Sequence, residues 1–232
     1  MNRAATWLKR VPGLAPLVRR MRGAEAAAPF PGSAAYWQQR YARGGDSGAG
    51  SYGKFAQFKA RVLNALFVEL GLSSVVEFGS GDGNQVTLLA VRDYLGVDIS
   101  AEAVALCRAR FDGAAGRRFI LEREYGGEQA DCALSLDVIY HLVEDAAFDA
   151  YMRRLFAAAT RCVVVYSSNR ADAASARCAD GAHVRHRVFT DWIAANEPGW
   201  SLLRQVPNEH PFRGDYRSGS FADFYIYLRR RA

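Results

Sequence analysis

The sequence predicts an α/β fold whose core is a mainly parallel sheet covered by helices on both faces. A short β-branched segment, SVVEF at 74–78, and a fully apolar one, CVVVY at 162–166, are typical of strands buried on both faces. Segments with helical spacing alternate with them, as the crossovers of a parallel sheet require. Half of the 232 residues are hydrophobic, which excludes a disordered chain. No apolar run reaches the ~18 residues of a membrane-spanning helix.

The first 32 residues differ in charge from the rest. Residues 1–32 hold six Lys or Arg and one Glu, so they carry most of the net charge of +6. The near-neutral body, residues 33–232, argues against a nucleic-acid partner. Trp, Leu, Val and Met recur at spacings of three and four within 1–22, beside arginines. An apolar stripe beside arginines can make peripheral contact with an anionic membrane surface, although two prolines and the short length weaken that interpretation, and a free tail or a helix packed on the body is the alternative.

Two helices and a loop are expected before the first strand. Residues 33–42 have a helical pattern, with Ser33 as the expected N-cap. Five glycines within 43–53 predict a loop. Apolar side chains recur at helical spacing through 54–70, and Gly71 is expected to end that helix.

From residue 74 onward, strands and helices alternate. The expected strands are 74–78, 94–97, 118–121, 132–136, 162–166, 200–206 and 221–228, and the expected helices are 84–91, 100–111, 146–160 and 190–196. No helix separates the last two strands, so one of them is expected to be antiparallel.

The most specific local signal is a glycine loop between the first strand and the helix that should follow it. It reads EFGSGDGNQ from Glu77, with glycines at 79, 81 and 83. Glycines let a backbone turn tightly and approach a ligand closely. The third glycine comes one residue too early for a dinucleotide fingerprint, which disfavours an NAD-dependent oxidoreductase, and no Gly-Lys-Ser/Thr follows, which excludes a P-loop.

Carboxylates stand at the tips of three expected strands. Glu77 precedes the glycine loop by two residues, Asp98 ends the second strand, and Asp137 follows the fourth. A carboxylate at the Asp98 position can accept from both hydroxyls of a ribose. Together these acids favour a cationic ligand that contains ribose over one rich in phosphate.

Several motifs resemble class I S-adenosylmethionine-dependent methyltransferases, over about residues 33–228. EFGSGDG is similar to the family's first motif, GVDIS to its acidic second-strand motif, and SLDVIYHL to the segment at and after the fourth strand. The resemblance implies a Rossmann-like doubly wound sheet of seven strands with an antiparallel last strand. It also implies that residues 33–71 form an N-terminal helical cap over the cofactor. GSYG, GDGNQ, YSSN and HVRHRVFTDW further resemble bacterial methyltransferases associated with surface polysaccharide synthesis.

The resemblance implies S-adenosylmethionine as cofactor and assigns roles to residues. Gly79, Ser80 and Gly81 would contact its methionine part, and Glu77 would orient the loop or accept from the amino group. Asp98 would bind the ribose, Ile99 would flank the adenine, and Asp137 would line the methionine end. An acid after the third strand often meets the adenine amino group, and ERE at 122–124 leaves its identity open. Aromatic side chains of the cap could stack on the cofactor, and Tyr52 in its glycine-rich loop is the one placed in the site.

Methyl transfer to a hydroxyl benefits from a general base, most often His. His141 and His186 are the candidates, because both follow strands at the expected rim. His183, Arg185 and Arg187 surround His186 and could hold an anionic acceptor. No metal is expected, since no third ligand accompanies the two His of HVRHR.

The predicted enzyme is thus an O-methyltransferase acting on a small-molecule or glycan-linked acceptor in surface polysaccharide synthesis. The alternatives are an N-methyltransferase or small-metabolite enzyme, and a non-catalytic cofactor-binding scaffold protein. Four cysteines without C-x-x-C spacing are typical of a reducing compartment, so a cytoplasmic protein, peripheral to the inner face of the membrane, is expected.

Overall fold

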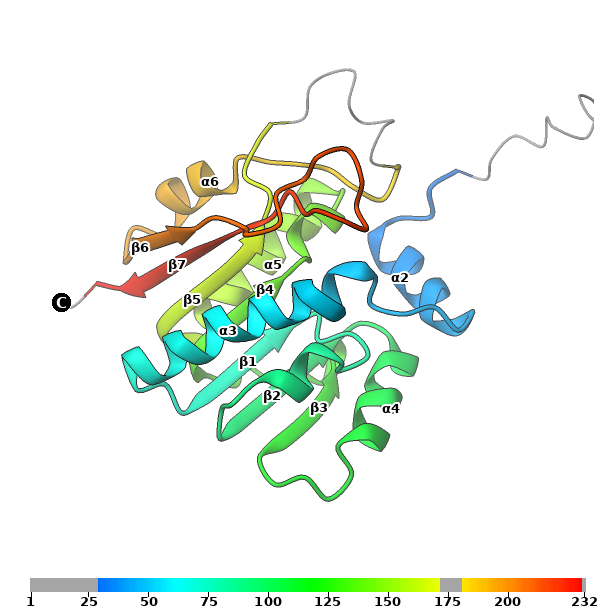
Figure 1. Ribbon diagram of the computed structural model, residues 1–232, viewed down its shortest axis with the longest axis horizontal. Helices are drawn as coiled ribbons and strands as arrows, with labels where there is room; N and C mark the ends of the chain where they lie inside the picture. Colours follow the sequence, from blue (N-terminus) through cyan, green and yellow to red (C-terminus); the bar gives the residue numbers. More distant parts are fainter. Residues whose placement is uncertain (1–28, 172–180, 231–232) are drawn as a thin grey trace, which may run out of the picture. The chain divides into compact units, whose positions relative to one another are not determined.

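The sheet at the centre of the fold has the predicted arrangement. The computed structural model describes residues 29–171 and 181–230, and the chain from Pro31 onward forms one compact unit. The described strands form one seven-stranded sheet in the order β3-β2-β1-β4-β5-β7-β6 (Figure 1). The strands are β1 (Ser74–Phe78), β2 (Asp93–Asp98), β3 (Arg117–Leu121), β4 (Ala130–Leu136), β5 (Ala159–Ser167), β6 (Trp200–Val206) and β7 (Asp223–Arg229).

Strand direction also agrees with the prediction. The β1–β2, β1–β4, β2–β3 and β4–β5 pairs are parallel, whereas β7 is antiparallel to both β5 and β6. β7 is therefore the reversed strand, and the doubly wound sheet expected from the methyltransferase resemblance is confirmed.

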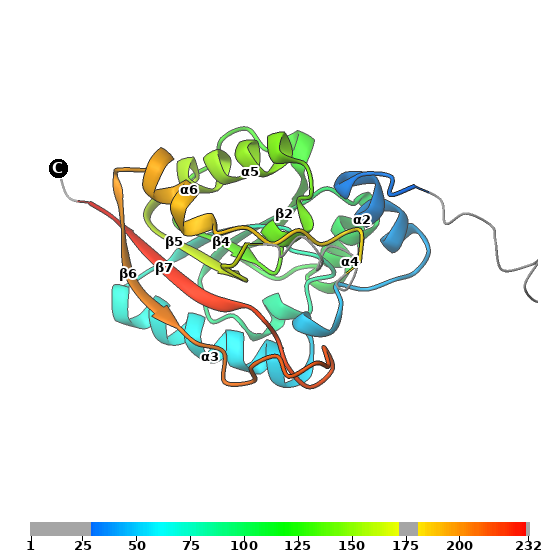
Figure 2. The same cartoon turned by 90° about the horizontal axis from the view of Figure 1, so that it is seen from above.

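Helices cover both faces of the sheet. The longer helices are α2 (Ser33–Ala42), α3 (Gly53–Leu70), α4 (Ala101–Arg110), α5 (Asp145–Ala157) and α6 (Phe189–Asn196). Apolar side chains of α3 and α4 pack with one face of the sheet, and those of α5 and α6 pack with the other (Figure 2). Successive residues of β1 enter opposite cores, Val75 the first and Val76 the second, as strand alternation requires.

The expected helix over 84–91 is wrong. Only one 3₁₀ turn, η4 (Gln85–Leu88), forms there. Side chains from elsewhere bind the backbone groups that a longer helix would use: the Asn64 amide donates to the carbonyl of Leu88 and accepts from the N–H of Ala90. The Arg117 guanidinium donates to the carbonyl of Leu89. The chain therefore becomes extended after one turn.

Two helix ends also differ from expectation. Ser33 is the first residue of α2 rather than its N-cap, which is Gly32. Its hydroxyl instead donates to the Glu144 carboxylate, 2.6 Å away, and tethers α2 to the start of α5. Helix α5 ends at Ala157, because the chain enters β5 two residues later and pairs with β4.

The strand order creates a crevice beside β1. From β1 the chain crosses to β2 and β3 on one side, and later elements add β4 and β5 on the other. Ligands of such sheets bind where the order reverses, outside the carboxyl ends of the strands. The tips of β1, β2 and β4, which carry the predicted site residues, meet there. In the described part of the chain no helix is long and apolar enough to cross a membrane.

Candidate active site

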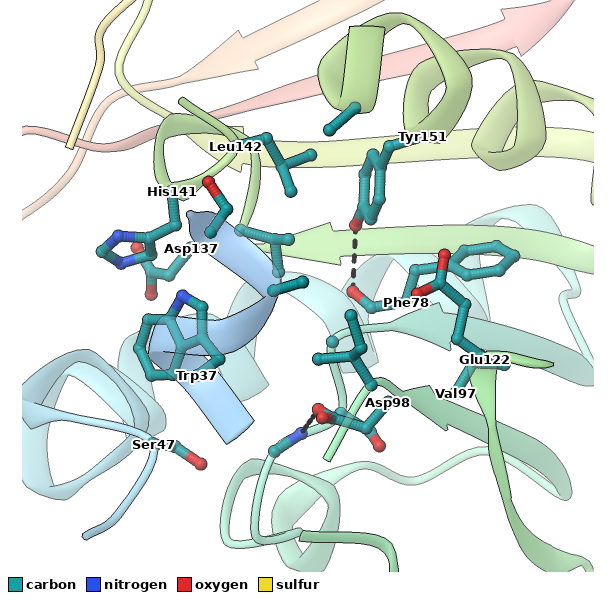
Figure 3. A pocket seen from close by; sticks show the side chains of 18 of the residues that line it. Trp37, Ser47, Phe78, Val97, Asp98, Glu122, Asp137, His141, Leu142 and Tyr151 are labelled. Atoms are coloured by element: carbon teal, nitrogen blue, oxygen red, sulfur yellow. Dashed lines mark hydrogen bonds between the residues drawn. The ribbon is translucent and has the colours of Figure 1, made fainter. Parts of the chain in front are cut away.

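A cavity of about 470 Å³ lies at this edge of the sheet. It is lined by α2, the glycine loop, the tips of β2 and β4, and α5. Figure 3 shows Asp137, His141 and Trp37 toward one end of the cavity and Asp98 and Glu122 toward the other. Eight of the predicted site residues line it: Glu77, Gly79, Ser80, Gly81, Asp98, Ile99, Asp137 and His141.

The glycine loop needs its glycines for both backbone conformation and space. Gly79 and Gly81 have φ values of 83° and 58°, in the left-handed region that side chains with a Cβ avoid. A Cβ on Gly79 would lie 2.5 Å from Val138, and one on Gly81 would lie 2.2 Å from the Ser47 hydroxyl. The loop therefore presents bare backbone to the cavity.

Asp98 at the tip of β2 is buried and held by backbone donors. One carboxylate oxygen accepts from the N–H of Gly81 at 2.9 Å, and the other accepts from the N–H of Ser100 at 2.9 Å. Burial raises the pKa of Asp98, and the hydrogen bonds from Ser100 and Gly81 oppose that shift. The side chain thus fixes the loop while lining the cavity beside Ile99.

Glu77 is buried under the glycine loop at the end of β1. The Tyr94 hydroxyl donates to its carboxylate at 2.6 Å. Burial raises the pKa of Glu77 to about 7, while Tyr94 and Lys59 act to lower it and Asp98 and Asp137 act to raise it. With a pKa near 7, the Glu77 carboxyl can change its ionisation state near neutral pH when a charge is added beside it.

Asp137, directly after β4, forms an ion pair with a buried lysine. Lys59 Nζ lies 2.8 Å from one carboxylate oxygen, and the Tyr140 hydroxyl donates to the other at 2.9 Å. Asp137 is the only non-glycine residue of the described chain with a positive φ, at 61°. Its N–H donates to the carbonyl of Tyr166. These contacts hold the residue in a conformation that few side chains adopt.

His141 forms part of the cavity wall among other aromatic rings. Its Nδ1 lies 3.0 Å from the carbonyl of His183, and its ring lies edge-on to Trp37 with centroids 4.8 Å apart. A carbonyl can only accept, so Nδ1 carries the proton and Nε2 keeps a lone pair. Burial lowers the pKa of His141 to about 4, so the ring is neutral near pH 7.

His186 and its neighbours do not line the cavity. The Nδ1 of His186 lies 2.6 Å from the Ser168 hydroxyl, and its Nε2 faces the Arg170 guanidinium at 2.9 Å. Arginine can only donate, so the lone pair of Nε2 already accepts a hydrogen bond. Arg185 and Arg187 donate to the carbonyl of Val143 and pair with Asp145. His183 stacks between Tyr36 and His141.

Comparison with known proteins identifies the chain. Residues 76–164 match the family model described as a methyltransferase domain. The protein is a class I methyltransferase that uses S-adenosylmethionine. No curated protein sequence matches it.

Solved structures share the fold of this methyltransferase. The magnesium protoporphyrin IX methyltransferase of Synechocystis PCC 6803 with bound S-adenosylhomocysteine is 17% identical, with a TM-score of 0.61 over 84% of this chain and 97% of that one. The N-methyltransferase NodS of Bradyrhizobium japonicum WM9, in complex with the same ligand, is 13% identical, with a TM-score of 0.64 over 86% and 99%. A methyltransferase of Clostridium acetobutylicum ATCC 824 is 11% identical, with a TM-score of 0.56 over 84% and 97%.

Tyr52 lies behind the cavity lining of the methyltransferase and fastens the cap to the glycine loop. Its hydroxyl and the N–H of Ser47 both donate to one oxygen of Asp82, and the N–H of Asn84 donates to the other. Burial acts to raise the pKa of Asp82, but these hydrogen bonds outweigh it and hold that pKa below its usual value. Asp82 thus joins the 46–52 loop to the loop after β1.

We expect Asp82→Asn to loosen the cap. The substitution keeps the shape of the side chain but replaces one accepting oxygen with an NH₂ group, which can only donate. Whichever way the amide is oriented, either Tyr52 and Ser47 or Asn84 lose their acceptor. Leaving these half-buried donors without partners costs about 1–3 kcal/mol, so urea unfolding should show a loss of that size. Affinity for S-adenosylmethionine should fall about tenfold with it. Tyr52→Phe, which removes one donor, is the control and should cost about 1 kcal/mol. An unchanged affinity in Asp82→Asn would contradict the fastening role.

We expect cofactor binding at about pH 6 to release close to one proton. With a pKa of about 7, Glu77 is mostly protonated in the free protein at that pH. A cationic ligand favours the carboxylate, so its binding lowers the pKa of Glu77 and the proton leaves. Calorimetry in two buffers of different ionisation enthalpy counts that proton. Glu77→Gln should abolish the release, and a wild-type protein that takes up a proton would contradict the sign.

Some lining residues carry little sequence signal. Glu122 and Arg154 form an ion pair at the Asp98 end of the cavity, joining the tip of β3 to α5. Tyr151 of α5 reaches the carbonyl of Phe78 at 3.0 Å. Lys59 interrupts the apolar face of α3, and a lysine among Phe58 and Leu63 is a signal of paired burial that could have been recognised.

Proposed function

We propose that this methyltransferase transfers a methyl group to a hydroxyl oxygen of a small molecule, with His141 as the general base. One observation carries the proposal: a neutral His in the cavity wall whose Nδ1 faces a carbonyl and whose Nε2 keeps its lone pair. The neutral ring can take the proton of an acceptor hydroxyl as the oxygen is methylated. His186 is the weaker candidate, because its Nε2 already accepts from Arg170.

The polar groups of the cavity suit S-adenosylmethionine. The buried Ser80 hydroxyl and the Gln85 side-chain oxygen have no hydrogen-bond partner among the described residues, and both residues line the cavity. Gly79 and Gly81 line the cavity without side chains, so a ligand there can approach the backbone of the loop closely. When bound, the cofactor supplies a methyl group activated on a sulfonium. We assign Gly79, Ser80, Gly81, Glu77 and Asp137 to its methionine end.

The opposite end of the cavity suits the adenosine part. We assign Asp98 to the ribose hydroxyls and Ile99 to the adenine face, as the sequence resemblance implies. Glu122 lines the same end, so we add it as the acid after the third strand. Trp37 and Leu142 add apolar surface to the cavity wall, which suits a reaction that benefits from the exclusion of water.

The structural neighbours support a small-molecule acceptor for this enzyme. One acts on magnesium protoporphyrin IX by its name, and another is an N-methyltransferase. A glycan-linked acceptor in surface polysaccharide synthesis is the narrower version of the proposal, and it rests on the sequence resemblance. Incubation with labelled S-adenosylmethionine and panels of sugars, nucleotide sugars and phosphorylated metabolites tests both. Label transferred to amines alone would overturn O-methylation and favour the N-methyltransferase alternative. Binding without transfer to any panel would favour the scaffold alternative.

The basic tail extends the proposal to location. Residues 1–22 lie outside the described residues, so peripheral membrane contact rests on sequence alone. The full chain should bind vesicles containing anionic lipid in a salt-dependent way, and a chain lacking residues 1–28 should not. Equal binding by the two chains would remove this part of the proposal.

A further inference from the structure

The wall of the cavity holds more acidic than basic side chains. The carboxyl groups of Glu77, Asp98 and Asp137 all line the cavity. Among the described lining residues the Lys and Arg side chains are Lys59 and Arg154, and Arg154 pairs with Glu122 toward the other end. Lys59 therefore supplies the positive charge that pairs with Asp137 and acts to lower the pKa of Glu77.

Lys59 is held in place as completely as a core residue. Its side chain is 1% exposed, its Nζ lies 2.8 Å from Asp137, and it sits 5.3 Å from the centroid of the Tyr166 ring. Burying an ion pair costs desolvation that apolar residues of similar volume would avoid, and replacement by such residues is often neutral or stabilising. Stability alone therefore does not explain a lysine at this position of α3, and a role in the reaction is the better explanation.

The reaction changes the charge of the bound cofactor. The acceptor oxygen forms a bond to the methyl carbon, the carbon–sulfur bond breaks with its electron pair staying on sulfur, and the acceptor proton goes to the base. S-adenosylmethionine thus differs from S-adenosylhomocysteine by one methyl group and one positive charge. Buried carboxylates attract the sulfonium and not the thioether, so an excess of them stabilises the cofactor more than the transition state.

We propose that Lys59 is a positioning residue that fixes Asp137 and offsets its charge, and so limits the preference of the site for the sulfonium over the thioether. The proposal rests on the cofactor site assigned under Proposed function. The buried pair is neutral as a whole, so the negative charge that faces the sulfonium is reduced by one. The ratio of the affinities for S-adenosylmethionine and S-adenosylhomocysteine then depends on Lys59 and Asp137 together rather than on either residue alone.

Affinities for the two ligands test this, measured by calorimetry at about pH 8 with the full chain. Lys59→Met should raise the ratio of S-adenosylmethionine to S-adenosylhomocysteine affinity about tenfold, because Asp137 loses its counter-ion. Asp137→Asn should lower the ratio, because the ammonium is then unpaired. The double variant should return it to the wild-type value, and Lys59→Arg should leave it nearly unchanged. With an acceptor in hand, Lys59→Met should lower kcat and KM for the cofactor together.

These measurements distinguish a failure of the Lys59 proposal from a failure of the proposed cofactor site. If Lys59→Met and Asp137→Asn change both affinities by the same factor, Lys59 is merely structural and the proposal is overturned. If the wild-type protein binds neither ligand at this cavity, the proposed site fails instead. Thermal unfolding checks that each variant is folded. Should Lys59→Met fail to fold, the other two variants still test the proposal. The affinity ratio should fall in Asp137→Asn and return to the wild-type value in the double variant.

Discussion

His141→Gln lowers kcat for methyl transfer by about 10²–10⁴-fold while leaving S-adenosylmethionine affinity within a few-fold of wild type. General-base catalysis contributes rate factors of that size, and the amide of Gln cannot take a proton. Because burial lowers the pKa of His141 to about 4, the wild-type base stays unprotonated as pH falls. The wild-type kcat should therefore stay constant as the pH falls from about 8 through the usual His pKa, and it should decline only as the pH approaches 4. Single-turnover rates with a competent acceptor measure both effects.

His186→Gln is the matched control for this result. His186 is as buried as a core residue and is held between Ser168 and Arg170. Its replacement should lower the free energy of unfolding by about 1–3 kcal/mol through lost hydrogen bonds, with kcat reduced less than tenfold. A loss of kcat in His186→Gln that equals the loss in His141→Gln would contradict the assignment of the base.

Gly81→Ala weakens S-adenosylmethionine binding by more than 100-fold. The added Cβ would lie 2.2 Å from the Ser47 hydroxyl and 2.9 Å from the Tyr41 hydroxyl, at a φ of 58°. The loop must therefore shift, and its N–H must leave the Asp98 carboxylate, which it now meets at 2.9 Å. Calorimetric titration with the cofactor measures the loss.

Gly113→Ala controls for backbone strain alone. Gly113 has a φ of 70°, and no atom lies within 4 Å of the place that a Cβ would take. The substitution therefore costs about 1–2 kcal/mol of strain without a clash. Both variants should lose stability, but only Gly81→Ala should lose cofactor affinity. Equal affinities in the two variants would contradict the close approach of this loop to the ligand.

The sheet, and the meeting of the glycine loop with the strand-tip acids at one cavity, were predictable because their signals are local. A buried parallel strand reads as an apolar run, and the glycine loop and the acids at 77, 98 and 137 stand directly at strand tips. The parallel strands of one sheet all end at the same edge. Residues that directly follow such strands in the sequence therefore lie near one another in space. The helix expected over 84–91 failed for the opposite reason, since Asn64 and Arg117 act on it from distant parts of the chain.

The rest of the site depends on contacts that sequence spacing does not encode. HVRHR reads as a rim loop with free His and Arg side chains, yet Arg185 and Arg187 bind the 142–145 turn. Asp82 stands between two glycines of the loop with no sequence signal for its partners, and only the fold brings Tyr52 and Ser47 to it. Pairings across 30 residues or more are set by packing, so local pattern cannot assign them.

The central claim is that one cavity holds the cofactor between the glycine loop, Asp98 and Asp137, with its reactive end beside His141. A crystal structure of the protein with S-adenosylhomocysteine tests this most directly. We expect ribose hydroxyls within hydrogen-bond distance of the Asp98 carboxylate, the amino-acid part against Gly79 and Gly81, and the sulfur on the side of His141. A ligand bound elsewhere, or one whose adenosine lies at the Asp137 end, would contradict it.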